Sequence, residues 1–150
     1  MSTNVNPIKA EALSPAHALR NLLWVALLAM LAAIAANLVL YVVAGTLFPA
    51  VAAWPGAGPG QIVGATVAYL LFGVIALAVI ARCTSRPARH FLIVAVVGLV
   101  LSLALPIGVG FGYGAPGQPP ADTATVLTLS LMHVVAFAIS VPLFVRLALD

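Results

Sequence analysis

The chain has 150 residues, of which 64% are hydrophobic and 6% are charged, and its formal net charge is +3. A soluble domain carries about 25% charged residues, so three acidic and six basic side chains cannot cover a water-exposed surface of this size. The composition therefore excludes an ordinary soluble domain. The bases sit at the ends of apolar runs rather than in one patch, which argues against nucleic acid as a partner. The predicted surroundings of most of the chain are the lipid bilayer.

The apolar residues fall into four long runs. Residues 1–13 are polar and are predicted to form a flexible N-terminus, and the transmembrane helices that follow are predicted at about residues 21–48, 62–81, 91–109 and 124–145. About 20 helical residues cross a hydrocarbon core of about 30 Å. A segment in lipid must satisfy its own backbone groups, and these runs lack the alternation of barrel strands. The Pro- and Gly-rich gaps between them are predicted loops. We therefore predict a single transmembrane domain, an all-α four-helix bundle.

The basic residues predict how the bundle sits in the membrane. All six precede the first helix, lie between the second and third, or end the fourth: Lys9, Arg20, Arg82, Arg86, Arg89 and Arg146. Cytoplasmic segments carry an excess of Lys and Arg. The prediction is an up-down-up-down bundle with both termini and the central connection in the cytoplasm, in a bacterial cytoplasmic (inner) membrane. The five arginines are predicted to contact anionic lipid headgroups on that side.

Polar side chains inside the helices are predicted to share one depth. Counting 1.5 Å per residue from the cytoplasmic ends places five of them roughly 18 to 24 Å above the inner boundary. These are Asn37, Thr66, Tyr69, Ser102 and His133. Two interpretations compete. The layer either makes interhelical hydrogen bonds that fix the packing, worth about 0.6 to 2 kcal/mol each, or it lines a cavity that binds something.

His133 decides between these interpretations. No Asp, Glu, Lys or Arg lies deep in a predicted helix, and an ionisable residue at membrane depth is a functional hypothesis by default. The structural alternative is a neutral imidazole hydrogen-bonded to Asn37, Ser102 or Tyr69. A bis-histidine haem needs a second histidine at the same depth, whereas His90 is predicted at the cytoplasmic boundary, so only a homodimer would supply one. No cofactor is predicted.

Other residues predict how the helices begin, bend and pack. Asp122 or Thr123 is predicted to cap the fourth helix. Pro142 removes a backbone hydrogen bond and predicts a kink in that helix. Small residues predict faces at which helix backbones approach closely, among them Ala29, Ala33, Gly64, Ala68, Ala95 and Gly98.

The order of these features resembles a known protein family. An Ala-rich first helix contains "AANLVLY", an Arg-rich turn "RCTSRPARHF" follows the second helix, and the third contains "LVLSLALP". The fourth reads "LSLMHVVAFAISVPLFVRLAL". Over about residues 20–148 this is similar to a family of small bacterial four-helix integral membrane proteins of unknown function. The resemblance implies four helices and draws attention to Asn37, Ser102 and His133, and it implies no activity.

The sequence contains no motif that indicates an enzyme. It has no nucleophile–base pair and no Walker loop. Its three histidines lack zinc-site spacing, and its single cysteine, Cys83, allows no CxxC motif. We therefore predict a non-enzymatic integral membrane protein without a metal site, either an accessory or interaction subunit of a membrane-protein partner or a small homo-oligomer. Two alternatives remain: a small transporter or channel formed around the polar layer, and a haem, quinone or lipid binder that uses His133.

Overall fold

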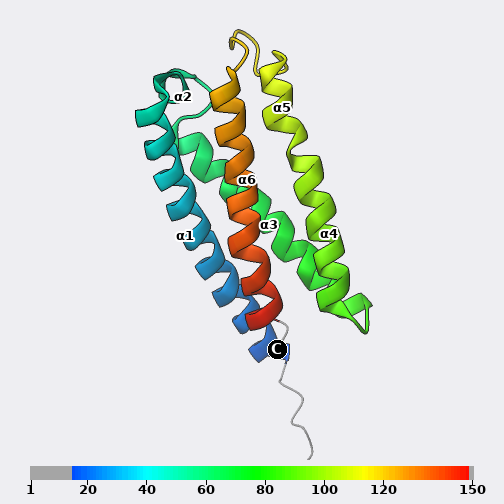
Figure 1. The fold of residues 1–150 in the computed structure, drawn as a ribbon. Helices are drawn as coiled ribbons and strands as arrows, with labels where there is room; N and C mark the ends of the chain where they lie inside the picture. The colour runs from blue at the N-terminus through cyan, green and yellow to red at the C-terminus, as the bar shows by residue number, and fades with distance from the viewer. Residues whose placement is uncertain (1–14, 149–150) are drawn as a thin grey trace, which may run out of the picture.

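The structure, a computed structural model, describes residues 15–148, and the flexible N-terminus predicted for residues 1–13 lies outside them. Its elements are α1 (Pro15–Leu47), α2 (Pro49–Ala53), α3 (Pro59–Cys83), α4 (Pro87–Ser102), α5 (Ala104–Gly110), α6 (Thr123–Leu143) and the π-helical turn η1 (Phe144–Ala148). The described residues contain no strand (Figure 1). Four segments are long and apolar enough to cross a membrane: Arg20–Leu47, Pro59–Cys83, Pro87–Gly110 and Thr123–Leu147. The predicted all-α, four-helix membrane fold is confirmed.

The two ends of the bundle differ in composition. At one end, the Trp54 indole N–H donates a hydrogen bond of 3.0 Å to the carbonyl of Pro119, which joins the α1–α3 connection to the loop before α6. At the other end, the Asn21 side chain donates to the carbonyl of Leu147 at 2.6 Å and ties α1 to η1. The α3–α4 turn lies at this second end as well (Figure 1). We call it the arginine end, because its segments carry the exposed side chains of Arg20, Arg82, Arg86, Arg89 and Arg146.

Helix α1 packs against α3 and α6 through a face of alanines. Ala29 and Ala33 are completely buried, and Ala26 is 5% exposed. These residues recur at the three- and four-residue spacing that puts side chains on one face of a helix. A methyl side chain lets two helix backbones approach closely, which favours association in lipid, where no hydrophobic effect drives it. The small residues predicted to pack on the first helix do so.

The ends of α6 reflect its sequence. The Asp122 carboxylate accepts a hydrogen bond of 2.9 Å from the backbone N–H of Thr125, which confirms the predicted cap. Pro142 lies in the last turn of the helix, and the wider π-helical turn η1 follows directly. There the backbone N–H of Phe144 donates to the carbonyls of Ser140 and Val141.

The third apolar segment is divided into two helices. Pro106 has no N–H to donate to the carbonyl four residues earlier, and the helix breaks at Leu103. Among the residues of α4 only Phe91 is buried. Beyond α5, the backbone N–H of Ala121 donates to the carbonyl of Val109 at 3.0 Å. The segment is therefore held near both ends, while the middle of α4 borders open space.

Two local predictions are wrong. The gap after the first span, predicted to be a loop, contains α2, and α3 begins at Pro59. Gly64 and Gly98, predicted to lie where backbones approach closely, contact no neighbour: a Cβ atom at either position would meet nothing within 4 Å. These two glycines leave space beside their helices.

Candidate functional site

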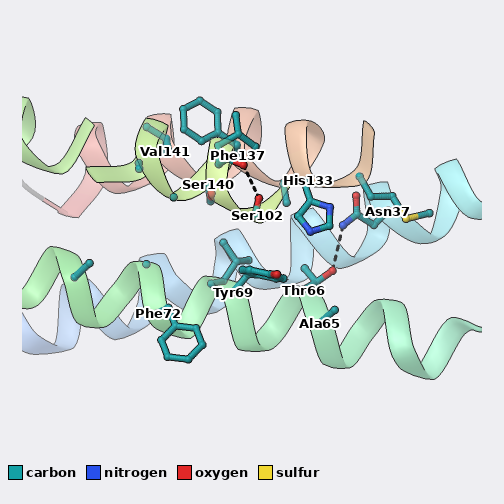
Figure 2. Close-up of a pocket in the computed structure, with 18 of the residues that line it drawn as sticks. Asn37, Ala65, Thr66, Tyr69, Phe72, Ser102, His133, Phe137, Ser140 and Val141 are labelled. Carbon is teal, nitrogen blue, oxygen red and sulfur yellow. Dashed lines mark hydrogen bonds between the residues drawn. The ribbon is translucent and has the colours of Figure 1, made fainter. Parts of the chain in front are cut away.

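A pocket of about 480 Å³ lies between α3, α4 and α6, with Asn37 as its contribution from α1. Most of its wall is hydrophobic and includes Leu70, Met132 and Phe137. All five residues of the polar layer proposed from the sequence line it (Figure 2): Asn37, Thr66, Tyr69, Ser102 and His133. The structure thus brings one polar cluster and a large apolar volume together within a single chain.

The mouth of the pocket lies on the flank of the bundle. Its exposed lining residues all belong to α3 and α4: Gln61, Ala65, Tyr69, Phe72, Val94 and Gly98. Every lining residue from α6 is buried or half-buried. The pocket therefore opens between the central parts of α3 and α4. In a transmembrane bundle this part of the surface faces the hydrocarbon of the bilayer.

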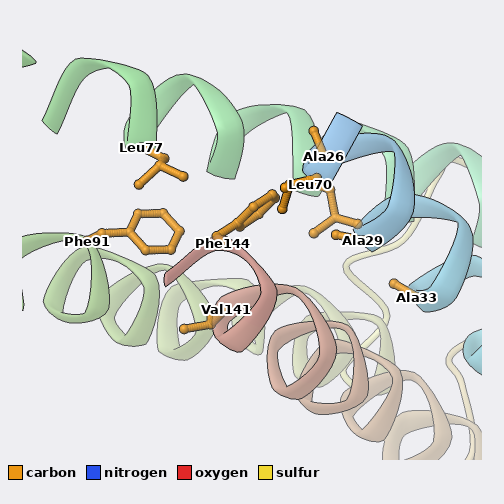
Figure 3. Packing of buried hydrophobic residues seen from close by; sticks show 9 residues of the cluster. Ala26, Ala29, Ala33, Leu70, Leu77, Phe91, Val141 and Phe144 are labelled. Carbon is orange, nitrogen blue, oxygen red and sulfur yellow. The ribbon is translucent and has the colours of Figure 1, made fainter. Parts of the chain in front are cut away.

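One end of the pocket is closed by the hydrophobic core. Phe144, 1% exposed, packs beside Phe91, with ring centroids 5.9 Å apart and planes at 79° (Figure 3). Such edge-to-face pairs are favoured over stacked faces. Leu70 and Val141 belong to the same buried cluster and also line the pocket. The contact between Phe91 and Phe144 fixes α4 against η1 and so sets the width of the pocket at this end.

Asn37 and Thr66 join two helices by a buried hydrogen bond. The amide nitrogen of Asn37 donates to the Thr66 hydroxyl oxygen at 3.1 Å. That hydroxyl donates its own proton to the carbonyl of Ile62 at 2.8 Å. Asn37 is 3% exposed, and its amide oxygen is buried without a hydrogen-bond partner. The protein therefore uses the nitrogen of this amide and leaves its carbonyl oxygen without a donor.

The imidazole of His133 makes one hydrogen bond, to its own helix. Nδ1 lies 2.8 Å from the carbonyl of Leu129, and because a carbonyl only accepts, Nδ1 donates. Nε2 is buried and has no partner. The ring of Tyr69 lies 5.2 Å away at an interplanar angle of 71°. The structural alternative, an imidazole hydrogen-bonded to Asn37, Ser102 or Tyr69, is not what the structure has: Nδ1 bonds the carbonyl one turn earlier in α6, and Nε2 bonds nothing.

Ser102 also hydrogen-bonds within its own helix. Its hydroxyl donates to the carbonyl of Leu99 at 2.7 Å. Of the five polar residues, only Asn37 and Thr66 therefore hydrogen-bond between helices through their side chains. The interpretation of the layer as interhelical packing accounts for that pair and leaves the placement of His133 unexplained.

We expect the Asn37–Thr66 bond to give a measurable coupling. In a double-mutant cycle of Asn37→Leu and Thr66→Val, followed by unfolding in mixed micelles, the coupling free energy should be about 0.6 to 2 kcal/mol. Ser102→Ala is the matched control, since its hydroxyl bonds only α4, and its combination with Asn37→Leu should be additive. Additive effects of the Asn37 and Thr66 substitutions would contradict the assigned bond.

Comparison with known proteins places the chain in a family. The model for the family of unknown function DUF6069 matches residues 17–150. The chain belongs to DUF6069. No curated protein and no solved structure matches it. The match covers all four membrane helices and confirms the resemblance to a family of unknown function, so the chemistry of this DUF6069 protein must be inferred from its pocket.

No group of three His, Cys, Asp or Glu side chains that would hold a metal ion occurs in the described part of this DUF6069 protein. His90 lies near the arginine end of α4, where its Nδ1 is 3.0 Å from the carbonyl of Arg86. The residues that line the pocket include one histidine, His133, and no carboxylate. A bis-histidine haem in this pocket would therefore need a histidine from outside the described side chains.

Sequence reasoning missed the apolar lining of the DUF6069 pocket. Phe72 and Phe137 are among the residues that line the pocket, yet in a membrane helix an apolar residue looks the same whether it faces lipid, core or cavity. One signal was available in α4. Ala95, Gly98 and Ser102 recur at three- and four-residue spacing, which marks a face of small side chains.

Proposed function

We propose that this DUF6069 protein is a non-enzymatic integral membrane protein that binds a lipid-soluble small molecule between α3, α4 and α6. The observation that carries the proposal is the pocket of about 480 Å³ with its mouth on the lipid-facing flank. Small-molecule sites measure about 300–1,000 Å³ and combine apolar walls with a few polar groups. A molecule dissolved in hydrocarbon reaches this mouth by lateral diffusion, without crossing water.

The arrangement favours this function over the accessory-subunit and channel alternatives. A channel formed by oligomerisation requires the polar layer to face a neighbouring copy. Here Asn37 and Thr66, which are 3% and 5% exposed, face the interior of one chain. An accessory role is supported by the apolar outer surface alone, and lipid contact explains that surface equally well.

Filling the pocket should remove its occupant. Gly98 lines the pocket and Gly64 does not, and a Cβ at either glycine would meet open space. We expect Gly98→Phe to lose a lipid-soluble molecule that the natural protein and Gly64→Phe both retain. The measurement is mass spectrometry of organic extracts after purification in polymer-bounded native lipid discs. Identical extracts from the two variants, or no retained molecule in the natural protein, would contradict the proposal.

We also propose that the arginine end faces the cytoplasm, where its arginines contact anionic headgroups. The single cysteine, Cys83, is exposed at the end of α3 and reports on this side directly. In spheroplasts, a membrane-impermeant maleimide should label Cys83 only after permeabilisation. Its matched control combines Cys83→Ser with Ala115→Cys in the opposite loop and should be labelled at once. The reverse pattern would overturn the orientation.

A further inference from the structure

The pocket presents two hydrogen-bond acceptors that the protein leaves without donors. They are Nε2 of His133 and Oδ1 of Asn37, both buried and both on residues that line the pocket. In the view of Figure 2 both side chains lie above Thr66 and Tyr69, which Asn37 and His133 contact through a hydrogen bond and a ring edge respectively. Buried polar atoms without a partner are rare in folded proteins and call for a physical explanation.

The hydrogen-bond network fixes which atoms are acceptors. Thr66 has one hydroxyl proton, which it donates to Ile62, so Asn37 must present its N–H group to Thr66 and keep its oxygen free. The Leu129 carbonyl likewise requires the proton on Nδ1 of His133. No carboxylate lines the pocket to balance an imidazolium, and a charge without a partner is costly at membrane depth. With the proton on Nδ1, Nε2 is the nitrogen that offers a lone pair.

No side chain among the described residues donates a hydrogen bond to either acceptor. The Ser102 hydroxyl donates to the Leu99 carbonyl. Tyr69 contacts the imidazole through its ring, in an edge arrangement. A molecule that enters from the bilayer must therefore bring a donor if either acceptor is to be paired. It must also be neutral, because the pocket offers no countercharge.

We infer that the occupant is a lipophilic alcohol or phenol whose hydroxyl donates to His133 Nε2 or Asn37 Oδ1. This rests on the binding function proposed above and names its ligand class. The apolar body of the molecule lies in the hydrophobic part of the pocket, which Leu70, Met132 and Phe137 help to line. A ketone, quinone or ether of the same shape carries only acceptors, so it would place a lone pair against a lone pair and leave both protein atoms unpaired.

The test compares two probes that differ in the donor alone. 4-Octylphenol and its methyl ether, 4-octylanisole, are added at fixed mole fractions to lipid nanodiscs that contain the full chain, and the midpoint of thermal unfolding is followed. A ligand that binds the folded state raises this midpoint by mass action. We expect the phenol to half-saturate at a mole fraction about tenfold lower than the ether, as one additional hydrogen bond to a buried acceptor predicts.

Substitutions assign the preference to the two acceptors. At least one of His133→Phe and Asn37→Leu, whichever removes the acceptor that the hydroxyl uses, should reduce the ratio between phenol and ether, whereas Ser102→Ala, whose hydroxyl is already used by α4, should preserve it. Equal half-saturation by both probes in the natural protein would overturn the donor inference and leave the binding function standing. A preference that survives in both the His133 and Asn37 variants would also overturn the inference. Failure of both probes to raise the midpoint would count against the inference and the binding function together.

Discussion

His133→Phe is expected to stabilise the ligand-free protein while it removes most of the preference for a phenol over its ether. In the ligand-free state the buried Nε2 atom lacks a partner, and an unsatisfied buried polar group costs about 1–3 kcal/mol. A phenyl ring has nearly the same shape and can keep the edge contact with Tyr69. The lost Nδ1 hydrogen bond joins the side chain only to its own helix. The free energy of unfolding should therefore rise by about 1 kcal/mol.

The sign of this change separates the two interpretations of His133. If His133 holds the helices together, its replacement by phenylalanine should lower the free energy of unfolding. If it serves a ligand, the same replacement should raise the free energy of unfolding and weaken ligand binding. Thermal unfolding in detergent and in nanodiscs measures the change in stability, and the comparison of the phenol with its ether measures the change in ligand binding. His90→Phe, at an exposed position, is the control and should change stability by less than about 0.5 kcal/mol. A lower midpoint combined with an unchanged probe preference would refute the ligand-binding role.

The sequence predicts the membrane helices well because composition leaves no alternative. Long apolar runs must be helical in lipid, and residues 15–148 contain four helices long and apolar enough to cross a membrane. The break at Leu103 shows the limit of this reasoning. Pro106 lies inside the third predicted span, and the break falls about one turn before it, near the Ser102 carbonyl that proline cannot pair. The resulting division into α4 and α5 depends on contacts at both ends of the segment.

The polar cluster was predictable in depth but not in direction. Helical rise alone places Asn37, Thr66, Tyr69, Ser102 and His133 at one height, and all five line the same pocket. The rotation of each helix about its axis decides which of its sides faces inward. In a bilayer both sides of a helix are apolar, so hydrophobic periodicity says little about this rotation. The imidazole could equally have bonded a neighbouring helix. The imidazole instead bonds the Leu129 carbonyl of its own helix, and the spacing of residues in the sequence does not predict this bond.

Phe144→Ala is expected to give the largest loss of stability in the bundle. Phe144 is 1% exposed and packs beside Phe91, the one buried residue of α4. In a water-soluble core, replacing a buried phenylalanine by alanine costs about 3–5 kcal/mol. In lipid the ring is not transferred from water when the helices pack, so that part of the cost is absent. The loss of packing contacts remains, and we expect the free energy of unfolding to fall by about 3 kcal/mol. Denaturation in mixed micelles measures the change.

Phe72→Ala is the matched control for this substitution. Phe72 also lines the pocket but is 69% exposed, so its ring exchanges protein contacts for lipid contacts when removed. Its substitution should cost less than about 1 kcal/mol. Equal losses in the two variants would mean that Phe144 does not hold α4 against η1. A much larger loss of stability for Phe144→Ala than for Phe72→Ala would measure the packing contacts of Phe144. The hydrophobic effect does not contribute to this difference, because both substitutions delete the same side chain in the same lipid and only the neighbouring residues differ.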